Sequence, residues 1–157
     1  MIAGMTTRIY LDSCCLGRLS DIDVQERVRL EAAAVTAVLR RVRLGEVKLV
    51  VSSALLEENR RDPLPKRRRY SRSLLRLATV QIDFDAADML RAKQLHKIGF
   101  GQADAFHVVA AEKAGCDAFL TTDDKLVRKA AQHNQLLHVR VINPVEWTME
   151  IGYGNQT

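Results

Sequence analysis

Short apolar runs and longer segments with helical periodicity alternate along almost the whole chain, and this alternation restricts the folds that the chain can adopt. The short runs have the continuous apolar character of buried strands. They lie at Arg8 to Asp12, Lys48 to Ser52, Thr79 to Asp83, Asp117 to Leu120 and His138 to Ile142. Strands separated by helices predict an α/β fold with a mostly parallel sheet, helices on both faces and right-handed crossovers.

The segments between these runs have the composition and spacing of helices. After a loop, apolar residues recur at steps of three and four, which is the spacing of one helix face, at Val28, Ala32, Val35, Leu39 and Val42. Asn143-Pro144 ends the last strand. Further helices are expected at Ser53 to Arg61, across the arginine-rich segment to about Leu77, up to about Lys97, from Gln102 to about Ala114, and up to about His133.

Length and composition indicate one domain. With 157 residues and 47% apolar content, the chain can bury one ordinary core but is short for two. We therefore expect residues 1–157 to form a single domain with a frayed tail from Gly152 to Thr157. No apolar run approaches the roughly 18 residues that suggest a bilayer span, so we expect a soluble, cytoplasmic protein. Cys14, Cys15 and Cys116 are odd in number, which predicts reduced, buried thiols.

Positive charge is concentrated in one segment. The net charge is +5, and the segment from Arg60 to Arg76 carries eight basic residues against one acid, Asp62, or +7, which leaves 5 − 7 = −2 for the remainder. Clustered charge favours a polyanionic partner such as nucleic acid. A solvated helix face is the alternative. The basic residues predicted to contact phosphates are Arg60, Arg61, Lys66, Arg67, Arg68, Arg69, Arg72 and Arg76.

Acidic residues near the ends of the predicted elements suggest a metal site. Asp12 ends the first strand, Glu58 lies in the helix after the second, Asp104 lies near the start of its helix, and Asp123 follows the fourth strand. Parallel sheets place ligands at the carboxyl ends of their strands, so these carboxylates can converge. Oxygen ligands favour Mg²⁺ or Mn²⁺, and such ions activate water for phosphodiester cleavage.

Each acid also has a structural alternative. Asp12 could cap a turn, Asp104 and Asp123 could serve helix N-termini, and Glu58 could pair with a nearby arginine. Their combination is more informative, because the chain has no Walker or dinucleotide glycine loop, no GxSxG turn and no HExxH pair. His107 lies one turn after Asp104. We expect it to be packed or hydrogen-bonded rather than a general base, since a metal-bound water needs no such base.

Four segments together resemble one family. They are YLDSCCL at Tyr10 to Leu16, SSALLEE at Ser52 to Glu58, GQADAFHVVAAEKAGCDAFLTTDDKL at Gly101 to Leu126, and NP at Asn143-Pro144. In order and spacing they resemble the PIN-domain nucleases, and within these the VapC-like toxins of toxin–antitoxin pairs. The resemblance covers nearly the whole chain.

The resemblance implies a PIN-like three-layer sandwich and metal-dependent RNA cleavage. It places the acidic positions of the family at Asp12, Glu58, Asp104 and Asp123. The adjacent acids Glu57 and Asp124 leave two of these ligands open, although family spacing favours Glu58 and Asp123. It also implies a small antitoxin as partner and a homodimer.

Two other classes of protein remain as alternatives. A PIN module without catalysis would keep the fold and bind RNA or regulate. A phosphate-receiver or phosphatase-like domain also gathers acids at strand ends, but Asp12 has no second acid at the DxD spacing.

Overall fold

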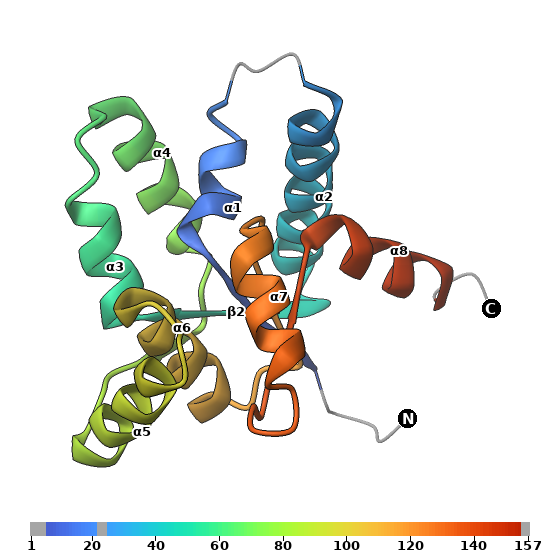
Figure 1. The fold of residues 1–157 in the computed structure, drawn as a ribbon. Helices are drawn as coiled ribbons and strands as arrows, with labels where there is room; N and C mark the ends of the chain where they lie inside the picture. Colours follow the sequence, from blue (N-terminus) through green and yellow to red (C-terminus); the bar gives the residue numbers. More distant parts are fainter. Residues whose placement is uncertain (1–5, 22–24, 155–157) are drawn as a thin grey trace.

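A five-stranded parallel sheet forms the centre of the molecule (Figure 1). The computed structural model describes residues 6–21 and 25–154. All four neighbouring pairs of strands are parallel, and the order across the sheet is β3-β2-β1-β4-β5. The strands are β1 (Thr7–Leu11), β2 (Val47–Ser52), β3 (Val80–Ile82), β4 (Ala118–Leu120) and β5 (Arg140–Ile142).

Eight helices in the described part of the chain flank this sheet and complete an α/β three-layer sandwich. In Figure 1, α5 and α6 lie together at one end of the molecule, and α2 lies beside α8. The helices are α1 (Ser13–Arg18), α2 (Glu26–Arg43), α3 (Ser53–Arg60), α4 (Pro65–Leu75), α5 (Ala86–Lys97), α6 (Gln102–Lys113), α7 (Asp124–Gln132) and α8 (Pro144–Gly154).

The strand order reverses between β1 and β4, and this reversal creates a place for a ligand. The chain leaves β1 toward β2, whereas β4 lies on the other side of β1 and leads on to β5. Because the connections diverge here, the carboxyl ends of β1 and β4 border a crevice. The N–H of Asp12 donates to the carbonyl of Leu120 over 2.9 Å, so the segments that follow both strands begin side by side.

Local signals in the sequence start the helices that leave this edge. The side chain of Ser52 accepts the N–H of Leu55 and caps α3. The side chain of Asp123 accepts the N–H groups of Lys125 and Leu126 and caps α7. Such caps satisfy N–H groups that have no partner inside the helix.

The strand and helix alternation predicted from the sequence is confirmed, with boundaries that coincide or shift by one or two residues. Two helices were not predicted. The segment expected to be a loop after β1 contains α1, and a further helix, α8, begins directly at Pro144. This last helix continues through Gly152 to Gly154, while residues 155–157 of the predicted tail lie outside the described residues.

The core lies on both faces of β1, β2 and β4. Tyr10, Leu49 and Phe119 have 0% of their surface exposed. All three cysteines are free, and Cys15 and Cys116 are buried whereas Cys14 is partly exposed. Within the described ranges, no helix combines the length and the apolar character that crossing a membrane requires.

Candidate metal centre

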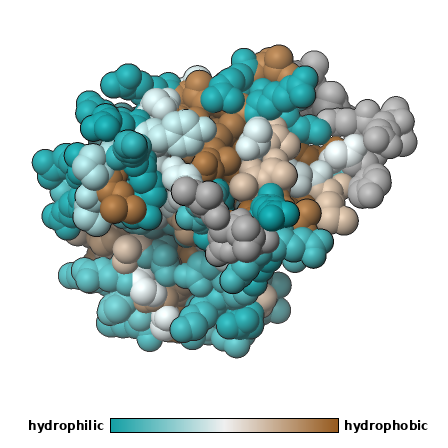
Figure 2. Space-filling view, turned by 90° about the horizontal axis from the view of Figure 1, so that it is seen from above, coloured by the Kyte–Doolittle hydropathy of each residue, from teal (hydrophilic) through white to brown (hydrophobic). Residues whose placement is uncertain are grey.

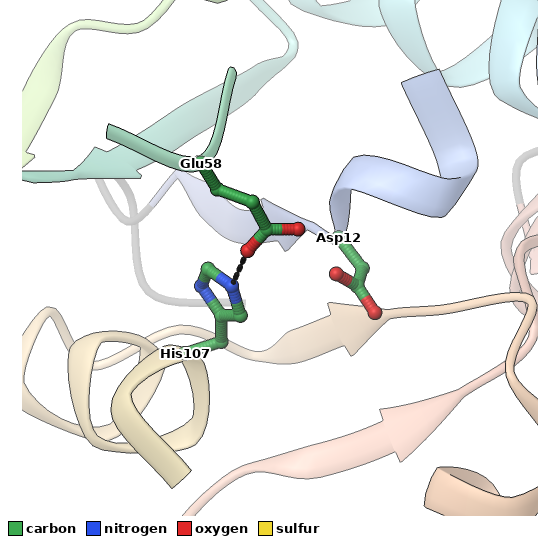
Figure 3. A group of neighbouring side chains, drawn as sticks. All are labelled: Asp12, Glu58 and His107. Carbon is green, nitrogen blue, oxygen red and sulfur yellow. Dashed lines mark hydrogen bonds and ion pairs between the residues drawn. The ribbon is translucent and has the colours of Figure 1, made fainter. Parts of the chain in front are cut away.

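Asp12, Glu58 and His107 form a compact group at the carboxyl edge of the sheet (Figure 3). Each contributes one potential ligand atom, and these atoms lie within 4.8 Å of one another. Asp12 follows β1, Glu58 comes from α3 and His107 from α6. In Figure 3 the carboxylate of Glu58 lies between the other two side chains. Folding thus joins residues that are far apart in the sequence.

Hydrogen bonds hold both oxygens of the Glu58 carboxylate. Oε1 accepts the hydroxyl proton of Ser13, and Oε2 lies 2.7 Å from Nε2 of His107. The side chain of Glu58 is 39% exposed, so solvent and a dissolved ion can reach it. The hydrogen bond with His107 lowers the pKa of Glu58 despite partial burial, and the bond with Ser13 acts in the same direction. Glu58 is therefore ionised at neutral pH.

Asp12 is much less accessible, with 6% of its surface exposed. Its Oδ1 accepts the N–H of Ser13 over 2.8 Å, and its Oδ2 accepts the hydroxyl of Thr121 over 2.9 Å. Burial, followed by the nearby Cys14 and Glu58, raises the pKa of Asp12 to about 7. An uncompensated charge at this position is costly, and a bound cation would remove that cost.

Asp104 lies outside the compact group but within its electrostatic field. It is in the first turn of α6 and is partly buried. Burial, followed by the charges of Asp12 and Asp123, raises its pKa to about 6. The excess of negative charge at this edge of the sheet therefore extends beyond Asp12 and Glu58.

Asp123 is exposed and also lies outside the compact group. One of its carboxylate oxygens, Oδ1, caps α7. Its backbone N–H donates to Oγ1 of Thr121 over 3.1 Å, and the same hydroxyl donates to Asp12. Thr121 thus connects the loop that carries Asp123 to the buried carboxylate of Asp12.

The acidic neighbours of the predicted ligands have other partners. Glu57 accepts hydrogen bonds from Arg60 and Arg61 on the exposed side of α3. The structure therefore turns Glu58 rather than Glu57 toward Asp12. Asp124 forms two hydrogen bonds, of 2.6 and 2.7 Å, with the guanidinium of Arg27. Neither Asp123 nor Asp124 belongs to the compact group.

The available donors fit a hard divalent cation. Carboxylate oxygens of Asp12 and Glu58 lie together, with the Asp104 carboxyl nearby. Such oxygens suit Mg²⁺ and Mn²⁺. Burial raises the pKa of Asp12 and of Asp104 and the neighbouring negative charges act in the same direction, so a bound cation would stabilise both ionised carboxylates.

His107 is buried and has a partner at each ring nitrogen. It is 1% exposed, with Nδ1 2.6 Å from the hydroxyl of Tyr10 and Nε2 2.7 Å from Glu58. The expectation of a hydrogen-bonded histidine is confirmed. Sequence reasoning missed the bond of Tyr10 with His107 and the bond of Ser13 with Glu58, although Ser13 directly follows Asp12 in the chain.

The basic residues predicted to contact phosphates fall into two sets. Four engage acidic or carbonyl groups nearby: Arg60 and Arg61 bond Glu57, while Arg67 and Arg68 bond the side chain and carbonyl of Asp62. The other four are exposed and have no ion pair with any residue that the structure describes. We call this second set the α4 stripe; its members are Lys66, Arg69, Arg72 and Arg76.

A cleft of about 510 Å³ adjoins the compact group between α1, α3 and α4. Ser13 and Glu58 line it, together with Arg18, Arg61 and Arg67, each of which forms an ion pair with a nearby acid. Seen from above in Figure 2, hydrophilic residues cover most of the left side of the molecule, where α3 and α4 lie. The candidate centre is therefore open to a polar ligand.

The family model of the PIN domain matches residues 9–132. This is most of the 157 residues, and the chain therefore belongs to the PIN-domain family. The match confirms the fold expected from the sequence. It includes all four acidic positions predicted as ligands.

Two solved structures have folds similar to that of this chain. FitAcB from Neisseria gonorrhoeae has a TM-score of 0.57 at 20% identity, over 87% of this chain and 97% of that chain. VapBC2 from Rickettsia felis, solved bound to a fragment of promoter DNA, has a TM-score of 0.56 at 11% identity, over 87% of this chain and 98% of that chain. At such low sequence identities, the similarity establishes a shared fold and nothing more. No curated protein matches the sequence.

Proposed function

We propose that this protein is a divalent-metal-dependent endoribonuclease and the toxin of a toxin–antitoxin pair. The observation that carries the proposal is the convergence of Asp12 and Glu58, 46 positions apart in the sequence, on one solvent-accessible edge of a PIN-domain sheet. The raised pKa of Asp104 supports it, because it places a third acid in the same field.

The residues of the centre have separable tasks. Asp12 and Glu58 would hold a Mg²⁺ or Mn²⁺ ion, with Asp104 and Asp123 as further ligands, directly or through water. When bound, such an ion lowers the pKa of a water molecule and stabilises charge on a phosphodiester. Ser13 and Thr121 orient the two inner carboxylates through hydrogen bonds. The α4 stripe would hold the RNA backbone through its phosphates.

Cleavage of RNA with and without metal tests the proposal. The wild-type protein should cut RNA in Mg²⁺ or Mn²⁺ and lose activity in EDTA, and Asp12→Asn should be inactive at every metal concentration. Asp124→Asn is the matched control, because Asp124 is bonded to Arg27 and lies outside the compact group. Activity that survives both EDTA and Asp12→Asn would refute a metal mechanism.

RNA binding without cleavage would identify the alternative, a PIN module that has lost catalysis.

Single-stranded DNA of the same sequence should be compared as substrate, because phosphate contacts alone do not distinguish the two polymers. Cleavage of DNA alone would refute the assignment to RNA.

The antitoxin and the homodimer are parts of the same proposal, supported by the family and by the fold likeness to FitAcB and VapBC2. Co-expression with a short neighbouring reading frame should suppress the activity and give a stable complex on gel filtration. Light scattering of the isolated chain should give twice the mass of 17.7 kDa. A monomeric mass, or full activity beside every neighbouring gene product, would contradict these two parts. Location in the cytoplasm stays a prediction.

A further inference from the structure

A chain of buried hydrogen bonds leads from the end of β2 to the candidate metal centre. Oγ of Ser52 lies 2.7 Å from the hydroxyl oxygen of Tyr10, which lies 2.6 Å from Nδ1 of His107. Nε2 of His107 lies 2.7 Å from Oε2 of Glu58. Ser52 and Tyr10 are 0% exposed and His107 is 1% exposed, so water does not compete for the two bonds among these three residues.

The chemistry of the groups assigns a direction to the bond with Glu58, and the neutral form of the ring then assigns the other two. An ionised carboxylate can only accept, so Nε2 of His107 carries a proton and donates it to Glu58. In the neutral ring, Nδ1 is then the acceptor, and the hydroxyl of Tyr10 donates to it. The oxygen of Tyr10 accepts in turn from Ser52, whose own oxygen accepts the N–H of Leu55 over 3.1 Å. Every donor in the chain has one acceptor.

Packing fixes the rings that carry these bonds. The ring of Phe119 in β4 stacks on Tyr10 at a centroid distance of 5.3 Å and on His107 at 6.5 Å. The interplanar angles are 23° and 24°. Neither ring can turn without disturbing the core, so Nε2 points at Glu58 permanently. Ser13 holds the other carboxylate oxygen of Glu58.

We infer that His107 is a positioning residue of the metal centre and not a metal ligand: its Nε2–H orients the Glu58 carboxylate beside Asp12. The inference rests on the proposed metal-dependent function. Binding an ion through Nε2 would require His107 to lose this proton and the bond with Glu58, in exchange for contact with a hard cation that prefers oxygen. Nδ1 faces Tyr10 and is not available.

Imidazole ¹⁵N–¹H NMR of the wild-type protein tests the inference directly. In the metal-free protein, His107 should show a proton on Nε2, and Glu58→Gln should shift its resonance because an amide oxygen accepts more weakly than a carboxylate. The proton should persist when Mg²⁺ is added to saturation. A metal-free ring with Nε2 unprotonated, or loss of this proton on adding Mg²⁺, would overturn the inference.

Two substitutions of His107 separate positioning from simple packing. His107→Gln can place an amide N–H near the position of Nε2, whereas the shorter side chain of His107→Asn cannot reach it. Mn²⁺ affinity, measured by calorimetry, should stay close to that of the wild type in His107→Gln. It should fall about 10-fold to 100-fold in His107→Asn, which is the usual cost of removing a group that orients a ligand.

The matched control is His96→Gln, since His96 lies on the exposed side of α5 and bonds the carbonyl of Phe100. It should bind Mn²⁺ as the wild type does. Circular dichroism shows which variants fold. If His107→Asn does not fold, the NMR experiment on the wild-type protein still tests the inference. Wild-type Mn²⁺ affinity in folded His107→Asn, or equal losses in folded His107→Gln and folded His107→Asn, would overturn the inference.

The outcomes also separate this inference from the proposed function. If the wild type binds Mg²⁺ with Nε2–H retained but cuts no RNA, the positioning role stands and the proposed function fails. If the wild type cuts RNA but the Nε2 proton is lost on adding Mg²⁺, the proposed function stands and the positioning role fails.

Discussion

Asp12→Asn should stabilise the metal-free protein above neutral pH, while it removes the stabilisation that Mg²⁺ gives. Burial raises the pKa of Asp12 from 3.8 to about 7, so the folded protein holds this proton more tightly than the unfolded chain does. The resulting stability is fully present below pH 3.8 and is lost as the pH rises through 7. Asparagine is uncharged at every pH, so the Asp12→Asn variant does not lose stability as the pH rises.

The size of the effect follows from the shift. A change of about 3 pKa units corresponds to about 4 kcal/mol at pH 8, at 1.36 kcal/mol per unit. Asparagine has one acceptor oxygen where the carboxylate has two, and Ser13 and Thr121 both use them. The weakened bonds cost about 1–2 kcal/mol. The net gain should be about 2–3 kcal/mol at pH 8 and close to zero at pH 5, where the cost of the Asp12 charge is only about 1–2 kcal/mol and is offset by the weakened bonds.

Urea denaturation in EDTA at both pH values measures these free energies of unfolding. Added Mg²⁺ should raise the value for the wild type according to its affinity, and should leave Asp12→Asn unchanged. In the control, Asp124→Asn, the pKa of the native carboxyl is lowered by its bonds with Arg27, so its stability is present at high pH and lost in acid. This control should show no gain at pH 8. A loss of stability by Asp12→Asn at pH 8 in EDTA would refute the reasoning.

Three further predictions concern the surroundings of the centre. Tyr10→Phe should lower the free energy of unfolding by about 2–4 kcal/mol, because it leaves Nδ1 of His107 and the hydroxyl proton of Ser52 without a buried partner; the exposed Tyr70→Phe should change it little, and equal effects in urea would contradict this. Mn²⁺ affinity should fall about tenfold between pH 8 and pH 6, because protons compete for Asp12; a pH-independent calorimetric affinity would exclude Asp12 as ligand. Alanine at all members of the α4 stripe should reduce the slope of log K for RNA binding against log salt by about 0.7 per lost phosphate contact; an unchanged slope would leave the stripe as solvated surface.

The strands and the long helix α2 were predictable because the way each element is buried determines the spacing of its apolar residues. Strands between two helical layers are continuously apolar, and α2 has the three-and-four spacing of a one-sided helix. The short helix α1 has only six residues, too few for a period to show. Asn143-Pro144 was interpreted only as the end of a strand, although proline also favours the first turn of a helix, as in α8.

The site was predictable in outline but not in its distances. Strand ends bring Asp12 and Glu58 to one edge, yet neither chain order nor spacing indicates that Asp123 stands outside the compact group. The pairing of Glu57 with Arg60 and Arg61 follows the i+3 and i+4 rule, and it could have been used to choose Glu58. The bond between Tyr10 and His107 joins residues 97 positions apart, and only tertiary packing determines it.

The hydrogen bond from Thr121 to Asp12 makes the working centre one of the last features that the chain can acquire. The two residues are 109 positions apart in the sequence. Contacts of such separation form late, because the chain between them must first lose most of its conformational entropy. In a nascent or truncated chain in which β4 is not docked on β1, Asp12 lacks the hydrogen bond from Thr121. Asp104 or Asp123 is then not in position beside it. The candidate metal centre is therefore not assembled until translation has passed β4.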